Sequence, residues 1–242
     1  MSEVEVRTVS YEVNGAPFEG RLLYPAEGKP DRALLMAPNF YGVSDAAEKL
    51  ARERVGERNV ILVLDPYGVE VRPASAGEAA EAMGAIRNDN AALRARLRAA
   101  LAVLREEAGK LGVAEDRVAV FGFCFGGACA LELARDGAHI RAAASFHGLL
   151  ETPEPEQSGP IRGPVLVMNG ADDPMVSAEA IAAFKVEMDN AGADWTFINY
   201  GGAVHSFTDP NASNPGTSEY NAKVARRAFA AMDDLFDEVF AD

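Results

Sequence analysis

One short segment constrains the fold of this chain more than any other: residues 122–127 read Gly-Phe-Cys-Phe-Gly-Gly. The apolar run Arg117–Phe121 precedes the segment, and the helical stretch Ala128–Arg135 follows it. This order predicts a strand, a sharp turn and a helix, with the Cys124 thiol at the apex. The flanking glycines fit the elbow G-x-nucleophile-x-G, with Cys in place of Ser. The positive end of the helix dipole favours a thiolate at that position.

Two other interpretations of the segment are weaker. A lone cysteine is commonly a buried, inert core residue, but the glycines and the strand-turn-helix context favour a nucleophile. A dinucleotide-binding fingerprint requires glycine where Cys124 stands. A phosphate-binding Walker loop requires Gly-Lys-Ser or Gly-Lys-Thr, and the sequence contains neither triplet.

Strand and helix signals alternate along the chain. Val4–Val13 and Pro17–Tyr24 predict a hairpin with Asn14-Gly15 as its turn. Further strands are predicted at Ala33–Ala37, Asn59–Leu64, Arg117–Phe121, Ala142–Phe146, Val165–Met168 and Trp195–Tyr200. Helices are predicted at Ala46–Val55, Ala79–Ala108 with a break near Arg87-Asn88, Ala128–Arg135, Ala178–Asn190 and Glu219–Val239. The pattern predicts a mostly parallel sheet with helices on both faces, in one α/β domain over residues 1–242.

Net charge, hydropathy and cysteine content indicate which partners the protein can bind and in which cellular compartment we expect it. The net charge of −14 disfavours nucleic acid and anionic membrane surfaces as partners. No apolar run approaches the roughly 18 residues of a membrane helix, and residues 1–10 lack the features of a signal peptide. The two cysteines, Cys124 and Cys129, are poorly placed for a disulfide, so we expect a reduced, cytoplasmic protein.

A thiol nucleophile needs a base, and three histidines are available. His205 follows the predicted strand Trp195–Tyr200 in a glycine-containing loop, which is the edge of a parallel sheet where ligands bind. His139 precedes a strand and is expected at the surface. His147 ends a strand at the correct edge and is a candidate for the substrate pocket, but it precedes the acid in the chain.

The orienting acid should follow the strand Val165–Met168. Asp173 fits the loop pattern G-x-x-D-x-x-V, and Asp172 is the alternative. One of the two is expected to cap the helix that starts near Ser177. The order nucleophile, acid, histidine is that of α/β-hydrolases.

An oxyanion hole requires two backbone N–H groups aimed at one point. One is expected from Phe125, directly after the nucleophile, and the other from Phe40, in a loop that could equally be an ordinary turn. Aromatic residues near a sheet edge belong either to the pocket or to the core. The candidates for the substrate pocket are Asn39, Tyr41, Tyr67, Phe123, His147 and Phe207.

With these motifs the chain resembles the dienelactone hydrolase family. The resemblance rests on the segments 39–43 (NFYGV), 65–67 (DPY), 122–127 (GFCFGG), 170–173 (GADD) and 205–207 (HSF). It implies a small α/β-hydrolase fold without a large lid domain, and no metal or organic cofactor. It also implies a triad of Cys124, Asp173 and His205 that cleaves an ester or enol-lactone through an acyl-thioester.

The sequence departs from the family pattern in two places. Asn39 stands where dienelactone hydrolases have a Glu that pairs with the resting thiol, so we expect a more thiolate-like Cys124. Dienelactone hydrolases also hold the substrate carboxylate with arginines. Thr208-Asp209 stands where one of them follows the catalytic His, and Arg72 and Arg87 are weak candidates for a second. Since Asp209 would repel a carboxylate, a neutral ester or lactone is the expected substrate.

Three functions other than hydrolysis are alternatives for this sequence. An acyltransferase would use the same triad with a different acceptor. An inactive hydrolase fold that serves as a binding protein should have lost a triad residue, and a thiol-redox protein should have a nearer second cysteine than Cys129. We therefore expect an enzyme that acts on a small molecule, as a monomer or small homo-oligomer.

Overall fold

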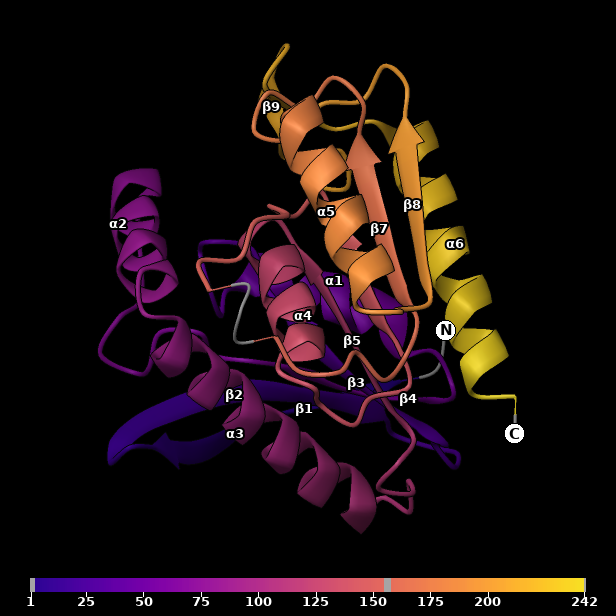
Figure 1. Cartoon of the computed structure of the whole chain (residues 1–242). Coiled ribbons are helices and arrows are strands. Elements are labelled where there is room, and N and C mark those ends of the chain that lie inside the picture. Colours follow the sequence, from indigo (N-terminus) through magenta and orange to yellow (C-terminus); the bar gives the residue numbers. More distant parts are fainter. Residues whose placement is uncertain (1–2, 155–157, 242) are drawn as a thin grey trace. The chain divides into compact units, whose positions relative to one another are not determined.

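The structure is a computed structural model that describes residues 3–154 and 158–241. The chain divides into two compact units, and the boundary between them falls after Val120. Strand β5 (Val118–Phe123) crosses that boundary. Figure 1 colours the elements of both units along the chain. Each unit is described by itself.

The first unit contains the predicted hairpin. Strands β1 (Val4–Val13) and β2 (Ala16–Pro25) pair antiparallel around Asn14 and Gly15, whose φ angles of 51° and 81° are both positive. Positive φ at both central residues is what a tight two-residue hairpin turn requires, and Asn-Gly tolerates it. Strand β2 pairs antiparallel with β4 (Asn59–Val63), and β4 pairs parallel with β3 (Arg32–Ala37). The predicted hairpin is therefore confirmed.

Three helices complete the first unit. Helix α1 (Asp45–Val55) contacts β4 and β2, and α3 (Asn90–Lys110) contacts β3 and β1. Helix α2 (Ala76–Arg87) ends where the sequence predicts a break, because the Asp89 side chain accepts a hydrogen bond from the Ala92 N–H and starts α3 there. Every side chain of β3 is buried, so this strand lies in the core of the unit.

The longer strands of the second unit are parallel. Strand β6 (Ala143–Phe146) pairs with β7 (Val165–Gly170), which pairs with β8 (Trp195–Tyr200), all in the same direction. The arrows of β7 and β8 point the same way in Figure 1. Helices α4 (Phe125–Arg135) and α5 (Ala178–Asn190) alternate with these strands. The carboxyl ends of parallel strands lie at one edge of a sheet, so the residues that follow β6, β7 and β8 are brought together.

Two helix starts in the second unit differ from the prediction. Helix α4 starts at Phe125 rather than Ala128, directly after the elbow. Helix α6 (Ala222–Val239) starts three residues later than predicted, because Glu219 pairs with Ser213 in a short antiparallel ladder. The Asn221 side chain then caps α6 by accepting a hydrogen bond from the Val224 N–H.

Within the described part of the chain, no helix combines the length and apolar character needed to cross a bilayer.

Candidate active site

Cys124 occupies a tight elbow between β5 and α4. Its φ of 54° lies in the left-handed region, which non-glycine residues rarely adopt and which marks strained functional positions. Gly127 permits the close approach of the helix: a Cβ there would lie 2.6 Å from Ser145 Oγ and 2.9 Å from Gly148 Cα. The glycine after the elbow is therefore a packing requirement of α4 against the end of β6.

The backbone of Cys124 is anchored on both sides. Its N–H donates to the Phe146 carbonyl at 3.0 Å and is 3.2 Å from Nδ1 of His147. Its carbonyl accepts from the Gly127 N–H at 2.9 Å, which starts the helix. The side chain is half-buried, so the thiol remains within reach of solvent.

His205 and Asp173 form a buried pair. His205 Nδ1 lies 2.8 Å from Asp173 Oδ2, and the other carboxylate oxygen accepts from the Met175 N–H at 2.8 Å. Asp172 is exposed, and its backbone N–H donates to the Ala203 carbonyl. Asp173, and not Asp172, therefore contacts the histidine.

Neither aspartate caps α5, in contrast to the prediction. Ser177 itself is the N-cap: its Oγ accepts from the Ala180 N–H at 3.1 Å. A serine at this position satisfies the helix, so the carboxylate of Asp173 is available to His205.

The electrostatic surroundings of His205 favour its charged form. Burial acts to lower the pKa of His205, but the hydrogen bond to Asp173 and the neighbouring Cys124 thiol outweigh it and raise the pKa to about 9. Nε2, the nitrogen opposite the Asp173 contact, is buried and has no hydrogen bond of ordinary geometry with any described residue. The arrangement suits an imidazolium beside a sulfur that becomes negatively charged.

His147 lies beneath the elbow instead of facing solvent. It is 2% exposed, and its Nε2 is 2.7 Å from the hydroxyl of Thr208. Burial and the nearby His205 hold the pKa of His147 well below 6.5, so its ring is neutral. Because Nδ1 accepts the Cys124 N–H, the proton sits on Nε2 and is donated to Thr208. Sequence reasoning gave no role to Thr208, which stands directly after the motif His205-Ser206-Phe207.

Two other predicted pocket residues are buried in aromatic packing. The Phe123 ring lies 4.8 Å from that of Phe146 and 6.0 Å from that of Phe229, in centroid distance. The Phe207 ring meets His147 edge-on at 5.0 Å and is fully buried. Both rings therefore support the elbow and the histidine loop from the core side.

The first unit carries the remaining candidates, in the loop after β3 and the turn after β4. Asn39 Oδ1 accepts from the Tyr41 N–H at 3.1 Å, and the Tyr67 hydroxyl donates to the Phe40 carbonyl at 2.8 Å. Gly42, at φ 72°, lies against the Tyr67 ring, which a Cβ would approach to 3.1 Å. The Phe40–Tyr41 peptide is thus held at both its N–H and its carbonyl. The Asn39 side chain is engaged within its own loop.

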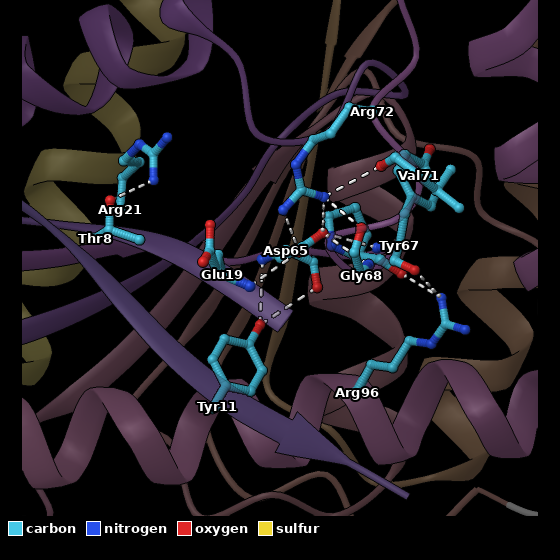
Figure 2. Close-up of polar contacts among 11 residues, drawn as sticks. Thr8, Tyr11, Glu19, Arg21, Asp65, Tyr67, Gly68, Val71, Arg72 and Arg96 are labelled. Atoms are coloured by element: carbon cyan, nitrogen blue, oxygen red, sulfur yellow. Dashed lines mark hydrogen bonds and ion pairs between the residues drawn. The ribbon is translucent and has the colours of Figure 1, made fainter. Parts of the chain in front are cut away.

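Asp65 organises the turn that carries Tyr67 (Figure 2). Its fully buried carboxylate accepts from the N–H groups of Tyr67 and Gly68 at 3.0 Å each and of Glu19 at 3.1 Å. Arg72 Nη2 lies 2.8 Å from the same carboxylate. Since this ion pair engages Arg72, the residue is poorly suited to hold a substrate carboxylate.

Across residues 3–154 and 158–241, no cluster of three His, Cys, Asp or Glu side chains could ligate a metal ion.

Comparison with known proteins identifies the family of the chain. The profile described as "Dienelactone hydrolase family" matches residues 18–240. An uncharacterised protein of Caenorhabditis elegans, K02A2.1, is 37% identical over 161 residues, which cover 63% of this chain and 97% of that one. Carboxymethylenebutenolidase of Pseudomonas sp. (strain P51) is 28% identical over 223 residues, 86% of this chain and 88% of that one.

Two solved structures are similar over almost the whole chain. The protein named m3DLH has a TM-score of 0.90 and 38% identity, covering 98% of this chain and 99% of that one. A dienelactone hydrolase-like promiscuous phosphotriesterase, P91, from metagenomic libraries has a TM-score of 0.88 and 34% identity, covering 98% of each chain. The predicted fold class, a mixed and mostly parallel α/β-hydrolase sheet with an N-terminal hairpin, is confirmed. The chain therefore belongs to the dienelactone hydrolase family of the α/β-hydrolase superfamily and is a dienelactone hydrolase-like hydrolase of lactones or esters.

Proposed function

We propose that this enzyme cleaves a small, neutral ester or lactone with Cys124 as the nucleophile, His205 as general base and acid, and Asp173 as the residue that orients His205. The single observation that carries the proposal is the buried His205–Asp173 pair at 2.8 Å, next to a thiol on a strained elbow. Each member follows a different parallel strand, and this is the arrangement that nucleophilic catalysis requires.

In the acylation step, His205 holds the proton of Cys124 and the thiolate attacks the carbonyl carbon. The C–S bond forms and the carbonyl π electrons move to oxygen. The N–H of Phe125 lies in the first turn of α4, where the helix dipole favours negative charge, and is proposed to stabilise this oxyanion. One such donor is typically worth about 3 kcal/mol. Phe40 stays a prediction as the second donor; its N–H has no hydrogen bond with any described residue.

The tetrahedral intermediate then collapses. The C–O bond to the leaving alkoxide breaks, and His205 gives its proton to that oxygen. An acyl-thioester on Cys124 remains. His205, neutral again, removes a proton from water, whose oxygen attacks the thioester carbon. The C–S bond breaks, the acid leaves, and the thiolate–imidazolium pair is restored. Asp173 stabilises the imidazolium in both steps without taking its proton.

Two charged residues, Asp209 and Arg72, argue for a neutral acyl group. Asp209 lies four residues after His205, and its carboxylate accepts from the Asn211 N–H at 2.9 Å. Arg72 is engaged by Asp65 at 2.8 Å. One relative is named a probable 2-oxo-3-(5-oxofuran-2-ylidene)propanoate lactonase, of Bradyrhizobium sp. Lactones therefore belong in the substrate panel beside esters, with carboxylated and uncharged members of each.

The test is hydrolysis of p-nitrophenyl acetate by the wild type, Cys124→Ala and Cys129→Ala. Cys129 is the matched control because it is the other thiol and is buried in α4. We expect turnover by the wild type and Cys129→Ala, with a burst of one p-nitrophenol per Cys124. Turnover by Cys124→Ala at the wild-type rate would refute the nucleophile. Adding an alcohol acceptor and analysing products distinguishes hydrolysis from acyl transfer.

A second candidate activity, on activated phosphotriesters, is favoured by the similarity to P91 at 34% identity. An aryl dialkyl phosphate assayed with the same three proteins tests it. Absence of any turnover, with ordinary thiol reactivity at Cys124, would instead favour an inactive binding protein. The mechanism needs a reduced thiol, which a cytoplasmic setting maintains.

A further inference from the structure

The proposed mechanism leaves one buried titratable group unused, the imidazole of His147. It directly follows β6 and has a φ of 41°, in the left-handed region. A side chain of this size adopts that conformation only where surrounding contacts hold it. One ring nitrogen of His147 contacts the backbone N–H of Cys124, and the other contacts the hydroxyl of Thr208.

The two ring nitrogens have different tasks. Nδ1 lies 3.2 Å from the backbone nitrogen of Cys124 and accepts its N–H, which is shared with the Phe146 carbonyl at 3.0 Å. Nε2 carries the proton and lies 2.7 Å from the Thr208 hydroxyl. These bonds connect positions that are 23 and 61 residues away from His147 in the chain. A neutral imidazole is the side chain that can accept at one end and donate at the other with both groups fixed in one rigid ring.

The loop that carries His205 also packs against the His147 ring through two aromatic contacts. The Phe207 ring meets His147 at 5.0 Å, and the His205 ring meets it at 5.1 Å, both edge-on. Ser206, at φ 55°, turns the backbone between them. The segment 205–208 is therefore held against His147 by two aromatic edges and one hydrogen bond.

We propose that His147 is a positioning residue for the thiol–imidazole pair, which ties the Cys124 backbone to Thr208 and so sets the distance between Cys124 and His205. This inference rests on the proposed function of the Cys124 site. The titratable group that faces His147 is His205, with Asp173 behind it, and Cys124 contacts His147 through its backbone N–H. A protonated Nδ1 could not accept the Cys124 N–H, and a second cation would oppose the imidazolium of His205.

The matched pair Thr208→Val and Thr208→Ser tests the inference. Valine has the shape of threonine but leaves the Nε2–H of His147 buried without an acceptor, whereas serine keeps the hydroxyl. We expect Thr208→Val to lose about tenfold to hundredfold in kcat with KM little changed, since small misplacements of reacting groups cost that much. The rate of Cys124 alkylation by iodoacetamide should fall in parallel, and Thr208→Ser should retain most of both rates.

A second variant keeps the test decisive if valine perturbs folding. His147→Asn tolerates the left-handed backbone and keeps an acceptor for the Cys124 N–H, but cannot reach Thr208. The double variant His147→Asn/Thr208→Val should lose no more than either single variant, because both remove the same connection. Wild-type rates in Thr208→Val, additive losses, or equal losses of rate and Tm in Thr208→Ser and Thr208→Val would overturn the inference. Alkylation is independent of the substrate, so silence of the wild type toward esters would count against the proposed function alone.

Discussion

His205 Nδ1 lies 2.8 Å from Oδ2 of Asp173, whose side chain is fully buried, while the adjacent Asp172 is exposed. Two neighbouring carboxylates with the same chemistry therefore have different surroundings. The Met175 N–H fixes the second oxygen of Asp173 at 2.8 Å, so that the carboxylate faces His205 in one orientation.

Replacing Asp173 with Asn should abolish most of the activity. The amide would favour the wrong His205 tautomer and could not stabilise an imidazolium, which typically costs about 10³- to 10⁴-fold in kcat. Steady-state kinetics on p-nitrophenyl acetate measure the loss. Asp172→Asn is the matched control and should stay within about twofold, since surface substitutions have small effects. Equal losses in the two variants would contradict the assignment.

Removing the thiol should lower the pKa of His205. In the wild type, burial lowers that pKa, but the hydrogen bond that His205 donates to Asp173 and the neighbouring Cys124 outweigh burial and raise the pKa to about 9. Cys124→Ala removes one of these contributions, and Cys129→Ala removes neither. NMR titration of the His205 ring proton compares the three proteins. An unchanged pKa in Cys124→Ala would mean that the sulfur does not interact with the imidazole.

The two buried histidines should give stability opposite dependences on pH. His205 has a folded pKa of about 9, above its ordinary value of 6.5, so its contribution is complete below pH 6.5 and is lost as pH rises to 9. His147 has a folded pKa well below 6.5, so the unfolded chain binds more protons and stability falls as pH drops below 6.5. Urea unfolding at a series of pH values measures the free energy of unfolding and so tests both declines.

Variants separate these contributions from those of the carboxylates. His147→Asn should flatten the decline below pH 6.5, and His205→Asn should flatten the decline between pH 6.5 and 9. If the stability of His147→Asn falls below pH 6.5 as steeply as that of the wild type, other groups cause this decline.

Gly127→Ala should damage the elbow. The added Cβ would lie 2.6 Å from Ser145 Oγ and 2.9 Å from the Gly148 backbone, so α4 must move away from β6. Overpacking of this kind costs about 1–3 kcal/mol in the free energy of unfolding. Gly84→Ala is the control, because a Cβ there meets nothing within 4 Å and alanine in a helix gains about 0.5–1 kcal/mol. Thermal unfolding of both variants should therefore shift in opposite directions.

Asp65→Ala should destabilise the first unit strongly. The substitution removes the acceptor of the Tyr67, Gly68 and Glu19 N–H groups and the partner of Arg72 (Figure 2). Leaving a buried N–H without an acceptor costs about 1–3 kcal/mol for each group. Arg72→Ala should cost less, about 1.5–3 kcal/mol, because the carboxylate keeps its three backbone donors.

The surface pair Arg52–Glu48, at 3.4 Å, is the control for Asp65. Arg52→Ala should cost less than about 1 kcal/mol in the same denaturant titrations. If Asp65→Ala costs no more than Arg52→Ala, the turn does not depend on the buried carboxylate.

Local patterns in the sequence determined the hairpin, the order of strands and helices and the elbow. Asn14-Gly15 predicts its turn because the pair tolerates positive φ, and the glycines around Cys124 predict a tight strand-to-helix connection. The alternation of apolar strands with helices predicts the parallel arrangement. The start of α6 could not be predicted in this way. Glu219 pairs with Ser213 in an antiparallel ladder instead of starting the helix, and this pairing depends on the fold of the loop between them.

Only the tertiary structure decided between chemically equivalent neighbours. Asp172 and Asp173 both fit the loop after β7, and the choice depends on which one meets a histidine 32 positions further along the chain. The bond from His147 to Thr208 spans 61 positions, and no local pattern marks it. Residues far apart in sequence acquire their partners from the packing of whole elements, so propensity and motif can place Cys124 and His205 on the correct loops but cannot orient their side chains.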